Sequence, residues 1–569
     1  MNRKLSYTSL LLTLISFRLV SQDLEKIGKK DMVTVNGGIN LNTIYLNTNN
    51  PASKRDPFSW YAAGNLTIGM LGWSFPFSYQ ISNQSRTYSQ PFNQYGVTPT
   101  YKWVKLYAGW SNVNFSQYTL SGYPFLGGGA ELSPKNWKII FLYGQFKKAV
   151  GYDFEKESDA NMSYKRMGIG AKIGYEKNGY SAFGTIFKAK DYSNSLSYIP
   201  ESTSLQPQEG TVISLQAKAP ILKIFSINAE YALSGMTRNS LSEIREKDQI
   251  QNKYPPFLLQ QRTTTEFFAA YKTSLAFTKK IFSISANYER IEPGYTTLGA
   301  FYFNNDFENV TLAPQLRLLK SKLNISLNGG LQRNNINNEK LNTTRRVIGS
   351  ANISFAPNTH WLLNGSYSNF TSFTRNRPNT DPFYALTPAD TLRFYQISQS
   401  GNFMTSYNFT KGDYRNSISL NGSTIISAQT MANTILPSTT VYNGNLSYAV
   451  SHTPSKFTIS FTANANKTVG QNINNLFYGP GLNLSKPFFK NALTISAGSL
   501  FNAAYTNNVN NGMVFSERLM VNFKPKTKQT KYGRPNFGLS CNYVNKPKVV
   551  SNGFMLSEFT GNLTAGYSF

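Results

Sequence analysis

The last nine residues, GNLTAGYSF (Gly561–Phe569), decide how the chain is expected to fold. Leu563, Ala565, Tyr567 and Phe569 fall on one side of an extended chain, and polar or small residues fall on the other. A period of two residues is typical of a strand with one apolar and one polar face. The alternation reaches Phe569 itself, so we expect the final strand to close a sheet.

The same alternation recurs along the chain, for example over residues 225–234, 282–289, 323–332 and 457–466. Strands of nine or more residues are long enough to cross a bilayer at a tilt. A sheet edge cannot face lipid unpaired, so a sheet that spans the membrane must close on itself. The sequence therefore predicts an all-β protein, an up-and-down antiparallel transmembrane β-barrel over residues 33–569.

The expected connections alternate between short and long, which is the pattern of an outer-membrane barrel with short periplasmic turns and long extracellular loops. Short turns are expected at 278–280, 357–359 and 452–455. Long loops are expected near 191–208, 236–264, 291–307, 371–392 and 429–437. A tight turn at Val104-Lys105 keeps the alternation regular and raises the count to about 26 strands, within a range of 24–26, an even number as in single-chain bacterial barrels. The first strand is expected from Met32 to Thr48, with both termini in the periplasm.

The first 21 residues have the character of a secretory signal peptide. Arg3 and Lys4 precede a largely apolar run from Leu5 to Phe17, and Ser21 is a small residue at the expected cleavage site. Residues 22–32 then form a short periplasmic segment. The rest of the chain has no apolar run of 18 residues, so no transmembrane helix is expected. These features predict export to the bacterial outer membrane.

The C-terminal residues Leu563, Tyr567 and Phe569 resemble the terminal signal that the assembly machinery of outer-membrane barrels reads. The whole chain also resembles a family of uncharacterised outer-membrane barrels from Bacteroidota. The residues that carry this likeness are Arg55-Asp56-Pro57-Phe58, Gln90-Pro91-Phe92-Asn93-Gln94-Tyr95-Gly96, Pro99-Thr100-Tyr101-Lys102-Trp103 and Tyr118-Thr119-Leu120-Ser121-Gly122. The resemblance implies an outer-membrane location and a barrel, and it supplies no catalytic motif.

The net charge is +29, which in a soluble protein would favour nucleic-acid binding. Export argues against that partner, and we expect none. One group of cations is expected near the short turns, where it either contacts anionic lipid headgroups or docks a periplasmic partner. The basic cluster of this group comprises Lys524, Lys526, Lys528, Lys531 and Arg534.

A second group of cations is expected on the polar, lumen-facing side of the strands: Lys172, Lys188, Lys272, Arg317, Arg346 and Arg518. Rings of Lys and Arg in a pore favour anions. The alternative is that these side chains pair with acidic groups such as Glu230 and Glu289 and only hold loops in place.

Residues that could support catalysis are sparse. The only histidines, His360 and His452, fall in expected short turns, and the single cysteine, Cys541, shares the parity of apolar neighbours. The glycines at 168, 170 and 174 lack the spacing of a phosphate-binding loop and more readily mark curvature or close packing in a strand. Asn-x-Ser/Thr triplets are attributed to composition. No catalytic, cofactor or metal site is predicted.

A barrel of this size encloses a lumen too wide to leave open, by comparison with porins of 16–18 strands. The first hypothesis is a gated transport channel with inward-folded loops and a basic lumen that favours anionic solutes. The second is a structural or accessory barrel that anchors surface loops or serves a secretion or surface-assembly complex. A third, for which no catalytic motif is found, is an outer-membrane hydrolase. Ser240-Leu241-Ser242-Glu243 has capping-box spacing, so we expect a short helix there, either outside the barrel or within it.

Overall fold

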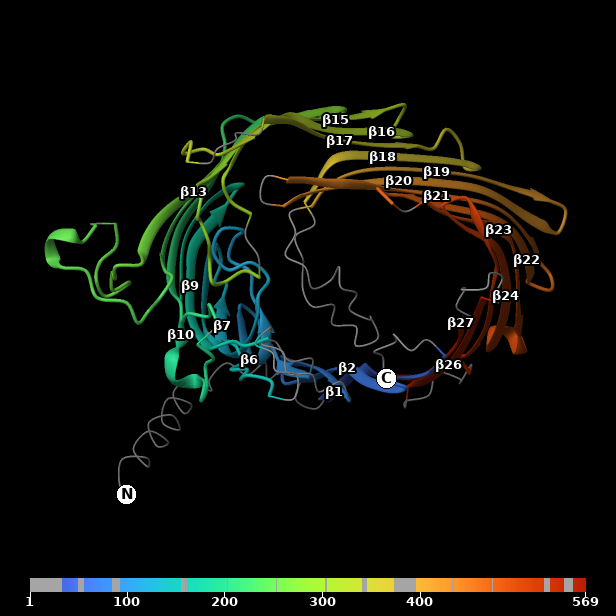
Figure 1. The fold of residues 1–569 in the computed structure, drawn as a ribbon, viewed down its shortest axis with the longest axis horizontal. Coiled ribbons are helices and arrows are strands. Elements are labelled where there is room, and N and C mark those ends of the chain that lie inside the picture. Colours follow the sequence, from blue (N-terminus) through green and yellow to red (C-terminus); the bar gives the residue numbers. More distant parts are fainter. Residues whose placement is uncertain are drawn as a thin grey trace, which may run out of the picture.

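The computed structural model describes residues 33–49, 56–83, 93–154, 159, 161–201, 203–251, 253–301, 304–339, 345–372, 396–431, 434–472, 474–525, 533–546 and 556–569. The expected signal peptide (1–21), the segment 22–32 and most of the expected loop 371–392 lie outside these residues. The described chain forms one antiparallel sheet that closes into a ring (Figure 1).

Consecutive strands are neighbours in the sheet. The first nine are β1 (Val33–Thr48), β2 (Phe58–Met70), β3 (Trp73–Ser82), β4 (Gln94–Val97), β5 (Thr100–Tyr101), β6 (Val104–Asn112), β7 (Pro124–Leu132), β8 (Trp137–Lys147) and β9 (Lys165–Lys177). The next nine are β10 (Tyr180–Tyr192), β11 (Glu209–Pro220), β12 (Phe225–Thr237), β13 (Thr265–Thr278), β14 (Phe282–Ile291), β15 (Phe307–Leu318), β16 (Leu323–Asn334), β17 (Arg345–Phe355) and β18 (Trp361–Ser372). The last nine are β19 (Gln396–Lys411), β20 (Tyr414–Met431), β21 (Thr434–His452), β22 (Phe457–Val469), β23 (Asn474–Phe488), β24 (Leu493–Thr506), β25 (Val509–Phe523), β26 (Arg534–Lys546) and β27 (Leu556–Ser568). Three single 3₁₀ turns are η2 (Ser193–Ser195), η3 (Lys247–Gln249) and η4 (Phe489–Asn491).

Two of these segments are parts of one strand. Both β4 and β5 pair with β3 on one side and with β6 on the other. The 27 segments of the described chain therefore make 26 strands. Strand β1 pairs with β27 from Gly38↔Ser568 to Thr48↔Glu558, which closes the ring. The predicted fold, a closed antiparallel barrel of about 26 strands, is confirmed.

Two local predictions are wrong. The tight turn lies at Lys102-Trp103, because Tyr101 already pairs with Val104 and Lys102 takes the left-handed backbone conformation with φ of 50°. The loop expected at 429–437 is mostly strand, since Met431 of β20 pairs with Thr434 of β21. The alternation of apolar and polar residues weakens in this segment. Backbone hydrogen bonds nevertheless extend β20 and β21 beyond the residues that alternate.

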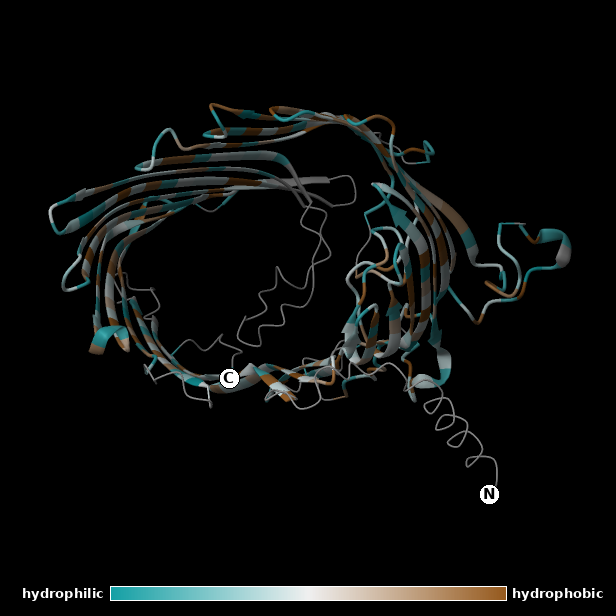
Figure 2. Cartoon of the chain, turned by 180° about the vertical axis from the view of Figure 1, so that it is seen from behind, coloured by the Kyte–Doolittle hydropathy of each residue, from teal (hydrophilic) through white to brown (hydrophobic). Residues whose placement is uncertain are grey.

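The two faces of the sheet differ in polarity, and Figure 2 shows hydrophobic and hydrophilic residues alternating along the strands. Large apolar side chains such as Ile169, Tyr231, Phe403 and Phe461 stay exposed on one face. This face is the outer one, because the opposite face meets chain segments that lie within the ring. Exposed apolar side chains around the outside suit the hydrocarbon core of a bilayer. No helix among the described residues is long and apolar enough to span a membrane.

Three long connections position the features described below. Residues 113–123, between β6 and β7, and residues 292–301, after β14, fold into the ring (Figure 1). These two segments together are called the plug. Residues 238–264, between β12 and β13, project outside the ring.

Candidate functional site

The two segments of the plug bind each other directly. The Tyr295 hydroxyl donates to the carbonyl of Tyr118 at 2.8 Å, and the Thr297 hydroxyl donates to the carbonyl of Thr119 at 2.7 Å. The amide of Ser121 donates to the carbonyl of Gly299 at 3.0 Å. The two connections, which lie far apart in the sequence, therefore form one unit.

An apolar core joins the plug to the inner wall. Phe115, Leu120 and Leu298 of the plug are buried together with Phe146 of β8 and Phe187 of β10. Glycines on β9 make room for these rings. A Cβ atom on Gly170 would lie 2.6 Å from the Phe115 ring, and one on Gly168 would lie 2.6 Å from the Phe146 ring. The close-packing interpretation of these glycines fits this arrangement.

Polar contacts anchor the same plug. The Lys172 ammonium on β9 donates to the carbonyl of Phe115 at 2.5 Å and to the Gln216 side chain at 3.2 Å. The Tyr118 hydroxyl donates to Glu289 Oε1 at 2.6 Å. Burial, reinforced by the negative charge of Glu289, raises the pKa of Tyr118. Burial also raises the pKa of Tyr295. Both hydroxyls therefore keep their protons at neutral pH and remain donors.

The cations expected in the lumen fall into different environments. Lys172 and Lys272 lie on the inner face, and Lys272 pairs across the ladder with Glu230 and Glu289. Arg317 and Arg518 also lie on the inner face by strand register, in the part of the ring away from the plug. The backbone of Arg346 belongs to β17, and its side chain lies outside the described part.

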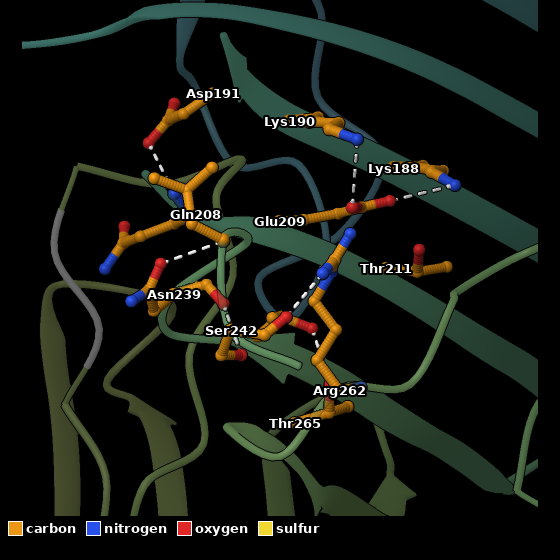
Figure 3. Close-up of polar contacts among 12 residues, drawn as sticks. Lys188, Lys190, Asp191, Gln208, Glu209, Thr211, Asn239, Ser242, Arg262 and Thr265 are labelled. Carbon is orange, nitrogen blue, oxygen red and sulfur yellow. Dashed lines mark hydrogen bonds and ion pairs between the residues drawn. The ribbon is translucent and has the colours of Figure 1, made fainter. Parts of the chain in front are cut away.

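The placement of Lys188 in the lumen is wrong. Lys188 pairs with Ile169, whose side chain is 43% exposed on the outer face. Its ammonium contacts Glu209 at 3.2 Å, and Lys190 contacts the other oxygen of Glu209 at 3.5 Å (Figure 3). Glu209 is buried, so this trio is part of the outer wall and not of a pore lining.

Residues 238–264 cover this part of the outer wall. The hydroxyl of Thr211, which pairs with Lys188, donates to the carbonyl of Leu258 at 3.0 Å. The helix expected to begin at Ser240 does not form. Asn239 instead caps a turn by accepting a bond from the amide of Leu241, and the one helical piece among the described residues of this connection is η3. The capping residue thus stabilises a turn without a following helix.

The short-turn end of the barrel is strongly basic. Its described turns between strands contain a single acidic residue, Asp413. They contain ten lysines: Lys102, Lys135, Lys223, Lys279, Lys280, Lys320, Lys322, Lys456, Lys490 and Lys524. Of the expected basic cluster, Lys524 and Arg534 flank the connection from β25 to β26. Lys526, Lys528 and Lys531 lie outside the described residues.

In the described part of the chain, the inner wall opposite the plug is accessible and carries two parallel rows of side chains, all of them amides or hydroxyls except Met404. The first row, from β16 to β22, is Asn324, Ser354, Asn364, Met404, Asn421, Asn445 and Asn464. The second, two residues along each strand, is Ser326, Asn352, Ser366, Asn402, Ser423, Asn443 and Asn466. All fourteen are exposed or half-exposed. We call these two rows the open wall.

The open wall lines a cavity of about 880 Å³, and Arg317 is the single charged residue among the described residues that line it. Neighbouring amides are linked across strands: Asn443 donates to Ser423 at 3.1 Å, and Asn445 donates to Asn464. An Asn side chain can make four hydrogen bonds, and these contacts use one or two of them. The remaining donors and acceptors of these side chains face the lumen.

The sequence did contain a signal for the open wall. Asparagine is followed two residues later by Ser or Asn at 324, 352, 364, 421, 443 and 464. Four of these, at 324, 352, 364 and 421, are Asn-x-Ser triplets, which composition alone was expected to explain. The structure places all six positions on the strands from β16 to β22.

The remaining residues singled out in the sequence lie away from the lumen. Leu563 and Tyr567 are exposed on the outer face. Cys541 pairs with the outward-facing Leu519. His360 and His452 lie at the short-turn end.

No family model matches the sequence, and no curated protein matches it either. Solved structures of large barrels do. The FrpB iron transporter from Neisseria meningitidis is 11% identical, with 96% of this chain and 82% of that chain covered and a TM-score of 0.36. The translocation pore of the P pilus usher PapC is 8% identical, with 94% and 100% covered and a TM-score of 0.41. The ferric enterobactin receptor PfeA from Pseudomonas aeruginosa is 9% identical, with 94% and 80% covered and a TM-score of 0.41.

Likenesses at these identities and TM-scores assign no function to this chain. Membership of the Bacteroidota barrel family, which the N-terminal motifs predict, stays a prediction.

Proposed function

We propose that the protein is a transport channel of the bacterial outer membrane, in which the plug restricts the lumen and solutes pass along the open wall. The observation that carries this proposal is the division of the inner surface. The plug covers the inner face of strands around β7 to β14, while the polar face of β16 to β22 stays accessible. A lumen lined on one side by hydrated amides and hydroxyls suits the passage of polar solutes.

The predicted preference for anions depends on fewer groups than the sequence implied. Lys172 is engaged by the plug, and Lys188 lies on the outer wall. Arg317 and Arg518 are the candidates that remain on the inner face of the described chain away from the plug. The proposed anion preference therefore concerns the small ions that pass Arg317 and Arg518, and the reversal potential in a salt gradient measures it.

Planar-bilayer conductance of the refolded protein tests the channel. Gly170→Leu forces a side chain into the space of the Phe115 ring and displaces the plug, so conductance should rise. The matched control is Gly184→Leu on the outer face of β10, where the nearest side-chain atom is 3.8 Å away, and it should conduct like the native protein. If all three proteins were silent, the channel proposal would be abandoned.

One observation favours the accessory role. The outer connection 238–264 exposes large apolar side chains, with Leu241 at 64%, Ile244 at 54% and Phe257 at 80%. Such residues at the long-loop end of the barrel are typical of a surface that binds another protein. A silent barrel that retains a partner through native purification, and loses it when Phe257 is replaced by Ser, would support this role.

A further inference from the structure

We infer that the open wall is a binding surface for neutral, hydroxyl-rich solutes of the oligosaccharide class. The inference deepens the proposed function and rests on it for the route by which the solute reaches the wall. It starts from the regularity of the two rows. Of the fourteen aligned positions on seven neighbouring strands, thirteen are Asn or Ser.

The chemistry of these side chains selects the ligand. Asn and Ser each carry donors and acceptors, whereas an anion can only accept hydrogen bonds and an ammonium group can only donate them. A hydroxyl group does both, so a polyol matches a surface of mixed amides and hydroxyls. Carboxylates are absent among the described residues that line the cavity, and Arg317 is the single cation.

Spacing makes the surface suitable for a chain molecule. Adjacent strands lie about 4.8 Å apart, and residues two positions apart on one strand are separated by about 6.7 Å. The open wall is therefore a grid of equivalent polar groups that continues over seven strands. An extended oligomer can contact several grid points at once, and each repeat of the oligomer meets the same chemistry.

Apolar side chains border the grid. Met404 replaces Asn or Ser in the first row, and Phe477 on β23 follows Asn466 at the end of the second row. Both line the cavity. A sugar ring presents apolar C–H groups on its faces and hydroxyls on its rim, so an apolar contact beside the amides complements it. The cavity of about 880 Å³ is large enough for an oligomer and too large for a single ion.

The test is calorimetric titration of the full-length protein in detergent with four neutral hexasaccharides of different linkage: maltohexaose, cellohexaose, laminarihexaose and mannohexaose. At least one should bind, and a charged oligogalacturonate of equal length should bind more weakly. Absence of binding by all four, or tighter binding of the charged oligomer, overturns the inference.

A paired substitution locates the site. Asn445→Val with Asn464→Val removes both partners of one hydrogen bond and leaves no partner unsatisfied, a change that is close to neutral for folding. It should weaken binding about tenfold, the effect of one or two lost hydrogen bonds to ligand. The control is Ser485→Val with Ser496→Val, an equivalent pair at 2.8 Å outside the open wall, and it should bind like the native protein. Equal affinity in both variants would contradict the assignment.

The two proposals fail differently. Binding in detergent without conductance in a bilayer removes the channel and leaves the binding surface. Conductance without binding of any neutral oligomer leaves the channel and removes the binding surface.

Discussion

Gly37 and Phe569 exchange two backbone hydrogen bonds, from the amide of Gly37 to the carbonyl of Phe569 at 2.9 Å and in the reverse direction at 3.0 Å. This pair begins the ladder between β1 and β27 at the short-turn end of the ring. The terminal aromatic residue is therefore part of the wall.

Closure can be tested with a disulfide. In this ladder the doubly bonded pair Gly37–Phe569 places Asn42 and Thr564 opposite each other at a non-hydrogen-bonded position, where the Cα atoms are closest. Asn42→Cys with Thr564→Cys should oxidise readily and change the gel mobility of the denatured chain. Asn42→Cys with Asn562→Cys is two residues out of register, because Asn562 pairs with Ile44, and it should cross-link poorly. Equal cross-linking of both pairs would contradict the register.

Loss of the Lys172 ammonium should loosen the plug. Lys172→Met keeps the side-chain length and removes the donor to the Phe115 carbonyl, at a cost of about 1.5–3 kcal/mol for a charged hydrogen bond. Hydrogen exchange of residues 113–123 should accelerate by about one to two orders of magnitude. Lys138→Met, which removes a partly exposed pair with Glu131 at 3.0 Å, should not change that exchange. Unaltered exchange in the Lys172 variant would show that packing alone holds the plug.

Alkaline pH should release the plug. Burial raises the pKa values of Tyr118 and Tyr295, and an unfolded tyrosine titrates near pH 10. A raised pKa in the folded state stabilises the docked plug fully below about pH 10, and the stabilisation is lost as the pH rises further. Protease sensitivity of residues 113–123 should therefore increase above about pH 10.

The matched variant for this transition is Tyr118→Phe with Tyr295→Phe, which cannot ionise. It should dock more weakly at neutral pH because the bonds to Glu289 and to the Tyr118 carbonyl are lost. Its protease sensitivity should lack the alkaline increase. An identical alkaline step in this variant would assign the transition to other groups.

Glu209 should control the outer connection 238–264. Glu209→Gln leaves Lys188 and Lys190 without their carboxylate, at a cost of about 3 kcal/mol at most because both lysines are partly exposed. Limited proteolysis should cut this connection faster, while conductance stays at the native level. A change in conductance with no change in cleavage would place Glu209 in the transport path instead.

The barrel could be predicted from the sequence because period-two alternation is a local property of each strand. The error at Lys188 has a physical cause. On β10 both faces carry apolar residues, since Phe187 and Ala189 meet the plug while Ile186 faces outward. Where the plug covers the inner wall, side chains that face inward, such as Phe187, are apolar. The polarity of alternate residues then does not show which of them face the lumen.

The plug itself could not be predicted in the same way. Its contacts join Tyr118 to Tyr295 and Phe115 to Gly170, residues that are distant in sequence and show no shared period. The open wall could have been found, because the spacing of Asn443 and Asn445 repeats that of Asn464 and Asn466. Only the strand register, however, shows that these pairs stand side by side.

The plug makes one side of the ring stiffer than the other. Strands around β7 to β14 are braced from within by a packed core and by anchors such as Lys172 and Glu289. In the described chain, the arc from β16 to β22 is held by its ladder bonds and by side-chain hydrogen bonds between neighbouring strands, and neither buried apolar cluster that braces the other side reaches it. Thermal deformation of the ring should therefore concentrate in that arc. The cross-section of the barrel should fluctuate on the side that carries the open wall, while the side that packs against the plug stays rigid.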